Sequence, residues 1–178
     1  FGTGSDHVRE KDGLWAVLFW LNVLAVRKQS VADIVTDHWQ KYGRDVYTRH
    51  DYEGVPAEGA NALMQHLRDA IVQLKGQHFE AYQVENSDDF SYTDSVDNST
   101  SSNQGIRILF TNGARIVYRL SGTGTEGATL RVYIEQPEKD PEKLEADPQD
   151  LLSELIQLSM SIARIEHYTG RKAPDVIT

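Results

Sequence analysis

The chain has no cysteine among its 178 residues. Disulfides, thiolate nucleophiles and zinc–thiolate sites are therefore excluded, and we expect a cytoplasmic location. Positive charge is also scarce: 18 lysines and arginines stand against 27 aspartates and glutamates, for a formal net charge of −9. We expect no nucleic-acid partner, because that binding needs cationic side chains spread over a broad surface. A local basic pocket on such an acidic protein would instead select a small phosphate ester.

Long hydrophobic runs are missing as well. The most apolar stretch, residues 14–26, is interrupted only by Asn22. It falls short of the ~20 residues that a membrane span needs, so we expect no membrane partner. Its apolar residues cover most of a helical circumference, which predicts a helix that is buried on several sides. Six histidines lack the short spacings typical of metal sites, so no metal site is expected within the chain.

The first 42 residues predict two helices that follow a loop. Asp12 can cap a helix that begins near Gly13, and Ser30 with Asp33 has the pattern of a capping box for a second helix that ends at Gly43. Because the first helix needs partners that this segment does not supply, we interpret residues 1–42 as the helical end of an α/β domain. The start of the chain within a loop also suggests a piece of a longer protein.

Residues 43–178 predict a second domain. Alternating or β-rich segments indicate strands at 44–52, 78–85, 105–111, 114–120 and 129–135, and the Asn112-Gly113 pair indicates a hairpin turn. Helical spacing predicts helices from Pro56 to about Gly76 and from Pro148 to about Gly170. Residues 94–104 and 136–148 have the composition of surface loops. The expected fold class is α+β, with a mostly antiparallel sheet covered by helices on one face.

The most informative segment is residues 119–131, Arg-Leu-Ser-Gly-Thr-Gly-Thr-Glu-Gly-Ala-Thr-Leu-Arg. If the flanking strands pair Leu120 with Leu130, Arg119 stands opposite Arg131 on the face away from the core. Two adjacent guanidinium groups are unfavourable unless an anion lies between them. Hydroxyl groups and uncovered backbone N–H groups in the loop complete a pattern that suits a dianionic phosphate. An ordinary hairpin loop with solvated arginines is the alternative.

Three segments resemble the phosphoglucomutases of the α-D-phosphohexomutase family: residues 119–134, residues 1–13 (Phe-Gly-Thr-Gly-Ser-Asp-His-Val-Arg-Glu-Lys-Asp-Gly) and residues 169–178 (Thr-Gly-Arg-Lys-Ala-Pro-Asp-Val-Ile-Thr). The resemblance implies a C-terminal domain of the kind shared with TATA-binding protein. It also implies that the loop binds the non-reacting phosphate of a phosphosugar. The residues implied in that binding are Arg119, Ser121, Gly122, Thr123 and Arg131.

Lys11 is the catalytic candidate. It directly precedes a helix whose positive end, with burial, would lower the pKa of the amine toward neutrality and allow proton exchange with a sugar hydroxyl. The resemblance places this lysine at the active centre, whereas the residues alone would favour an exposed loop charge. His7, in the same motif, is a candidate for contact with sugar or phosphate, although the residues favour a structural hydrogen bond at least as much.

The resemblance also shows what the chain does not contain. The family's phosphoserine loop, Ser-His-Asn-Pro, and its magnesium loop, Asp-Gly-Asp-Gly-Asp, are not in the sequence. We therefore expect Mg²⁺ to be bound by other domains of a parent chain, and this piece to be inactive alone. The expected reaction interconverts glucose 1-phosphate and glucose 6-phosphate through glucose 1,6-bisphosphate. The alternatives are a phosphomannomutase or phosphoglucosamine mutase, or a non-catalytic anion-binding module.

Overall fold

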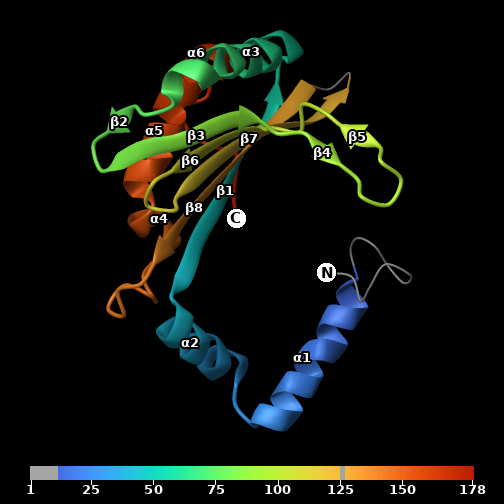
Figure 1. The fold of residues 1–178 in the computed structure, drawn as a ribbon, viewed down its shortest axis with the longest axis vertical. Coiled ribbons are helices and arrows are strands. Elements are labelled where there is room, and N and C mark those ends of the chain that lie inside the picture. Colours follow the sequence, from blue (N-terminus) through green and yellow to red (C-terminus); the bar gives the residue numbers. More distant parts are fainter. Residues whose placement is uncertain (1–11, 125–126) are drawn as a thin grey trace. The chain divides into compact units, whose positions relative to one another are not determined.

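A computed structural model of the chain describes residues 12–124 and 127–178. The chain divides after Gly43 into two compact units, and each is described by itself (Figure 1). The division falls where the sequence pattern changes from two consecutive helices to alternating strands.

The first unit contains α1 (Gly13–Arg27) and α2 (Val31–Tyr42). The backbone N–H of Trp15 donates to the Asp12 carboxylate at 2.9 Å, so Asp12 caps α1 as predicted. At α2 the Ser30 side chain accepts from the Asp33 backbone, and the Asp33 side chain accepts from the Ser30 backbone. The predicted capping box is therefore confirmed.

Residues 14–26 form a helix as predicted, and the burial that their composition calls for is not met within the described residues. α1 has no buried residue, and Leu14 and Val26 are each 81% exposed. Its apolar side chains are spread around the helix, so a single neighbouring element could cover only some of them. Within the described residues, α1 lacks the packing partners that its composition calls for.

The second unit is built on a seven-stranded sheet with the order β2-β3-β6-β7-β8-β1-β9, in which every described pairing is antiparallel. The strands are β1 (Arg44–Val55), β2 (His78–Phe79), β3 (Tyr82–Asp89), β6 (Ile106–Phe110), β7 (Arg115–Gly124), β8 (Gly127–Glu138) and β9 (Val176–Ile177). A separate small hairpin pairs β4 (Tyr92–Thr93) with β5 (Thr100–Ser101). The predicted α+β class is confirmed.

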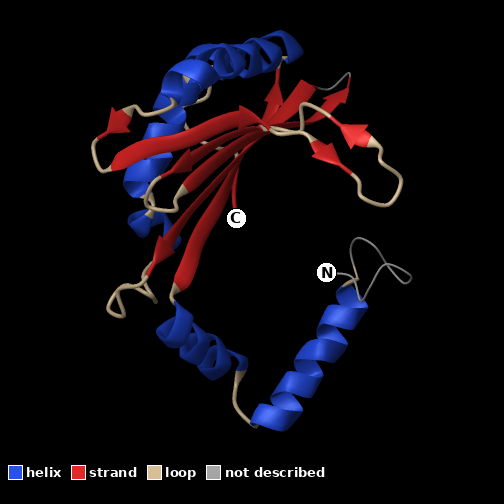
Figure 2. Cartoon of the chain, in the orientation of Figure 1, coloured by secondary structure: helices blue, strands red, loops and turns tan. Residues whose placement is uncertain are grey.

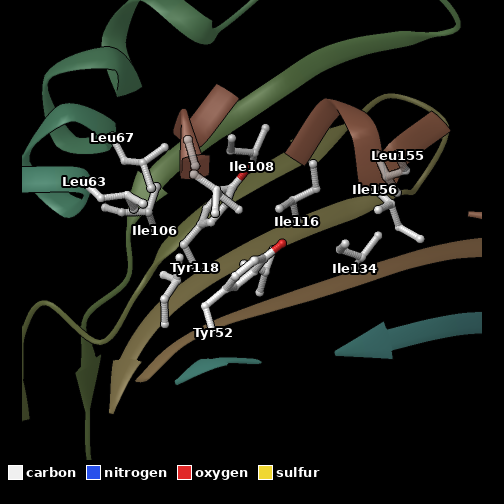
Figure 3. Close-up of a cluster of buried hydrophobic side chains, with 14 of the residues drawn as sticks. Tyr52, Leu63, Leu67, Ile106, Ile108, Ile116, Tyr118, Ile134, Leu155 and Ile156 are labelled. Carbon is white, nitrogen blue, oxygen red and sulfur yellow. The ribbon is translucent and has the colours of Figure 1, made fainter. Parts of the chain in front are cut away.

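Helices cover one face of this sheet (Figure 2). They are α3 (Ala57–Leu74), α4 (Pro148–Leu151), α5 (Ser153–Ala163) and α6 (Ile165–Thr169). Alternate residues of each strand point toward them, so Ile116 and Tyr118 of β7 are fully buried while Val117 between them is only partly buried. Figure 3 shows Ile116 and Tyr118 gathered with Leu63 and Leu67 of α3 in one apolar cluster.

The structure corrects four details. The predicted strand 78–85 is a hairpin that turns at Glu80, where φ is +52°. The predicted loop 94–104 contains the short strand β5. The final helix is broken into α4, α5 and α6, with Arg164 in the left-handed conformation between the last two. The C-terminal tail adds β9, which the sequence did not reveal because a two-residue strand has no measurable alternation.

Candidate functional site

The predicted register at the loop is confirmed. Leu120 of β7 pairs with Leu130 of β8, and Arg119 stands directly opposite Arg131. Both leucines face the helices, and both arginines therefore lie on the opposite face of the sheet. We call this the open face, because no helix of residues 44–178 covers it within the described part of the chain (Figure 2).

Two bulges shape the sheet beside the two arginines. On β7 the register moves between Ser121 and Gly124 so that one extra residue enters that strand, and Gly122 there has φ +65°. On β1 a matching shift between Tyr52 and Val55 leaves Gly54 at φ +60°. Bulges of this kind bend a strand and redirect its side chains, and they are common beside functional sites. Both bulges flank β8 at the base of the loop.

Gly127, the first residue of β8, lies close to the backbone of β1 at the base of this loop. A side chain on Gly127 would approach the Val55 carbonyl oxygen to 3.1 Å and the Gly54 backbone to 3.2 Å. Its φ of +97° is also in the region that favours glycine. Gly127 is thus more than a turn residue, because it lets β8 lie directly against the bulge of β1.

Charges on the open face are mostly paired. Arg115 of β7 donates to Glu135 of β8 through two nitrogens, at 3.1 and 2.5 Å. Arg107 of β6 forms a two-pronged pair with Asp88 at 2.8 and 2.7 Å, and these hydrogen bonds lower the pKa of the Asp88 carboxyl. Two-pronged pairs of this kind fix both partners.

Among the arginines of the open face, Arg119 is the exception. No acidic side chain pairs with Arg119 within residues 12–124 and 127–178, and the residue is exposed. Its stem lies over Gly105, where an added Cβ would come within 2.7 Å of the Arg119 Cγ atom. Gly105 therefore makes room for the stem of an arginine whose charge is available to a ligand.

Arg119 also forms one end of a hollow of about 640 Å³ on the open face. The hollow is lined by Tyr47, Thr48, Arg49, Arg115, Val117, Arg119, Tyr133, Ile134, Glu135 and Thr178. Its floor consists of β1, β7 and β8, and the last two of these strands also carry the loop and its two arginines.

The structure describes only some of the other predicted site residues. Ser121 is partly buried opposite Thr129, and Gly122 is exposed at the bulge. The backbone of Thr123 belongs to β7, but its side chain lies outside the described residues, as do His7 and Lys11 entirely. The structure thus brings Arg119, Arg131, Ser121 and Gly122 together at the end of the β7–β8 hairpin.

Sequence reasoning missed Asp51 and Gly105. Asp51 on β1 is paired in register with Arg131, and Gly105 precedes β6 beside Arg119. Neither stands near the loop in the sequence. Only the strand order, which places β6 and β1 on the two outer sides of the β7–β8 hairpin, reveals them.

Within residues 12–124 and 127–178, no three histidine or acidic side chains come together in a way that would hold a metal ion. None of the helices in that part of the chain is long and apolar enough to span a bilayer. The described site brings together two arginines, Arg119 and Arg131, and the hydroxyl group of Ser121.

Comparison with known proteins gives the family. Residues 44–175 match the family model described as Phosphoglucomutase-1, C-terminal domain, and residues 2–42 match Phosphoglucomutase/phosphomannomutase, alpha/beta/alpha domain III. The chain belongs to the phosphoglucomutase family. It is 56% identical to Phosphoglucomutase-1 of Homo sapiens over 184 residues and 55% identical to Phosphoglucomutase of Rhizobium radiobacter over 178 residues.

The phosphoglucomutase fold extends over the whole chain. The crystal structure of pp63/parafusin from Paramecium, described as an exocytosis-sensitive phosphoprotein and phosphoglucomutase in its open form, matches 100% of this chain with a TM-score of 0.84 and 44% identity. The match covers 31% of that chain, and this chain spans 33% of the human and Rhizobium relatives. It therefore corresponds to about a third of a phosphoglucomutase.

Proposed function

We propose that this chain is the part of a phosphoglucomutase that grips the non-reacting phosphate while glucose 1-phosphate and glucose 6-phosphate are interconverted through glucose 1,6-bisphosphate. The observation that carries the proposal is the pairing of Arg119 with Arg131 across a bulged, glycine-rich hairpin, with Arg119 lacking a counter-charge among the described residues. A phosphate between the two guanidinium groups would replace their mutual repulsion with charge-assisted hydrogen bonds.

The two arginines would act with the loop between them. Ser121 and Thr123 would supply hydroxyl donors. Gly122 has a φ of +65°, which favours glycine, and no other atom lies within 4 Å of the place where a Cβ would be. A phosphate oxygen could therefore approach the backbone closely at Gly122. Binding at a phosphate remote from the reacting oxygen orients the sugar and adds little directly to bond breaking. The loop would therefore determine affinity and alignment.

The proton-transfer role is proposed for Lys11, and a sugar or phosphate contact for His7. Both lie in the segment that matches the family's alpha/beta/alpha domain III model. We also propose that the chain contains parts of two domains. Residues 1–42 would end an α/β domain, and residues 43–178 would form the phosphate-binding domain. The break between the two family models and the division after Gly43 support it.

Mg²⁺ and the phosphorylated serine are proposed to belong to the remaining two thirds of the protein. The described residues offer no cluster of acidic side chains for the metal, so no step of the reaction is assigned to a metal bound by this chain. On this proposal the 178-residue chain alone has no mutase activity. A cytoplasmic location would suit a protein without disulfides.

The phosphate grip is tested by alanine substitution in the full-length product of the gene that encodes this chain. Arg119→Ala and Arg131→Ala should each raise KM for glucose 1-phosphate by roughly tenfold to a hundredfold, because each removes a charged hydrogen-bonding partner of the phosphate. Arg115→Ala is the matched control, since Arg115 lies on the same strand and face but is paired with Glu135. Unchanged KM in both test variants would exclude the grip.

A second measurement concerns Lys11. Lys11→Met keeps most of the stem and removes the amine, so kcat should fall by roughly 10²–10⁴ while the melting temperature stays constant. Activity within a few-fold of the unaltered enzyme would make Lys11 a surface charge. Mannose and glucosamine phosphates, assayed beside glucose 1-phosphate, distinguish the related mutases.

A further inference from the structure

A buried carboxylate, that of Asp51, lies beside Arg131 on the neighbouring strand. Asp51 of β1 is opposite Arg131 of β8, which is opposite Arg119 of β7, so the three residues form one row across neighbouring strands of the open face. The Asp51 side chain is only 6% exposed. A buried carboxylate is costly to keep unless positive partners surround it, so its place in this row requires an explanation.

Two arginines share this carboxylate. Arg49 Nε donates to Asp51 Oδ1 at 2.9 Å, and Asp51 Oδ2 lies 3.7 Å from Arg131 Nε. The Arg131 Nε atom is itself buried and has no hydrogen-bond partner in the described part of the chain. One oxygen of Asp51 is thus committed to Arg49, while the other is within ion-pair distance of Arg131 but just beyond a hydrogen bond.

The backbone that carries Asp51 is fixed from the outer side by the C-terminal tail. The Asp175 N–H donates to the Asp51 carbonyl oxygen at 2.8 Å, and Val176 of β9 pairs with Asp51 in register. Asp175 also accepts from the Glu53 N–H at 2.8 Å. The position of the carboxylate is therefore set by the sheet and the tail together, before any ligand binds.

The row is asymmetric in charge. Arg131 has a negative neighbour on its β1 side, whereas Arg119 on the β7 side has none among the described residues. The nearby carboxylate offsets the repulsion between the two guanidinium groups, and it lies on the Nε side of Arg131. The Nη side of Arg131 remains for a ligand, because no side chain within residues 12–124 and 127–178 hydrogen-bonds to it.

From these contacts we propose that Asp51 is a positioning residue that holds Arg131 for the phosphate. The inference rests on the proposed role of Arg119 and Arg131. Asp51 does not touch the phosphate; it restrains the guanidinium of Arg131 at the mouth of the loop. Arg119, whose stem lies over Gly105 without an ion pair, is the partner that adjusts to the ligand.

The test is Asp51→Asn in the full-length enzyme. Asparagine keeps the shape and can still accept from Arg49, so the fold should persist. If Asp51 positions Arg131, KM for glucose 1-phosphate and the inhibition constant of inorganic phosphate should both rise by about tenfold, with kcat nearly unchanged. A carboxylate that acted only through its charge would give the opposite sign, because removing it would strengthen phosphate binding.

Two further variants make the test specific. In the Arg131→Ala background, Asp51→Asn should have no additional effect on KM, since a residue that acts through Arg131 has nothing left to position. Asp88→Asn is the matched control, because Asp88 pairs with Arg107 on another pair of strands and should leave KM unchanged. Asp51→Glu, which retains the charge, should keep KM within about threefold of the unaltered enzyme.

The outcomes separate the two proposals. An unchanged or lowered KM in Asp51→Asn, together with a raised KM in Arg131→Ala, would overturn the positioning role and leave the phosphate grip standing. Full additivity of Asp51→Asn and Arg131→Ala would also overturn it. If neither Arg119→Ala nor Arg131→Ala changes KM, the phosphate grip itself fails. If Asp51→Asn lowers the melting temperature, the decision passes to Asp51→Glu, which keeps the charge. A KM for Asp51→Glu that rises as much as the KM for Asp51→Asn would overturn the positioning role.

Discussion

The two faces of the sheet use the same strands in opposite ways. On the covered face, neighbouring strands contribute fully buried apolar residues such as Ile108, Ile116 and Ile134. On the open face, the intervening positions carry arginines that form ion pairs with acids, Asp51 being shared by Arg49 and Arg131, while Arg119 has no acidic partner among the described residues. The covered face stabilises the fold through area and packing, whereas the open face holds charges in place for a ligand.

Buried polar groups occur on both faces. On the covered face the Tyr118 hydroxyl donates to the Ser159 carbonyl at 2.8 Å, and His50 Nε2 lies 3.0 Å from Gln149 Oε1. Gln149 in turn donates to Thr48 at 2.8 Å, so its Oε1 is the acceptor and His50 Nε2 carries the proton. Among the described residues, each face keeps one buried side-chain atom without a hydrogen-bond partner: Asp89 Oδ1, on a carboxylate whose Oδ2 accepts from Arg68 of α3, and Arg131 Nε on the open face.

The sharpest test of this difference uses two adjacent residues of β7. Ile116→Ala should lower the free energy of unfolding by about 2–5 kcal/mol, because it leaves a cavity in the packed face. Val117→Ala, its neighbour on the open face, should cost about 1 kcal/mol or less. Residues 44–178 have their own core, so urea unfolding followed by circular dichroism can be measured on that unit. Equal losses would contradict the division between the faces.

A smaller loss of stability is expected from a substitution in the C-terminal tail, which pairs with β1 at the edge of the sheet. Arg171 donates to Asp175 at 2.9 Å and to the Glu53 carbonyl at 2.9 Å, which fastens the tail to the bulge of β1. Arg171→Ala should therefore lower stability by about 1 kcal/mol. Lys172→Ala is the control, because the Lys172 side chain is 84% exposed. Protection of the β9 amides from hydrogen exchange should fall in the first variant only; loss in both would implicate the tail as a whole.

The smallest expected effect is a dependence on pH from the covered face. Burial lowers the pKa of His50 below its ordinary value of 6.5, against smaller raising contributions from Gln149 and Asp51. The unfolded chain then binds more protons than the folded one as pH falls through 6.5, so stability decreases, by at most about 1.4 kcal/mol per pH unit. His50→Gln should flatten the slope of unfolding free energy between pH 7.5 and 5.5. An unaltered slope would exclude His50 as its source.

Local patterns in the sequence were sufficient for much of the fold. The caps at Asp12 and Ser30, the Asn112-Gly113 turn and the pairing of Leu120 with Leu130 depend on residues close together in the chain, and all are confirmed. The breaks within the final helix were not predicted, because its apolar spacing continues across Leu152 and Arg164. The burial of α1 was predicted from composition and is not met in this chain, since burial depends on partners rather than on the helix itself.

What the sequence determined by itself is the arginine pair: alternation and the glycine-rich loop place Arg119 and Arg131 opposite each other, because a hairpin is a local structure. What only the tertiary structure decided is the surroundings of that pair. Asp51 lies 80 positions before Arg131 in the numbering, and Gly105 belongs to a different hairpin. Strand order brings both beside the arginines, and strand order is set by how the whole sheet buries its covered face against the helices.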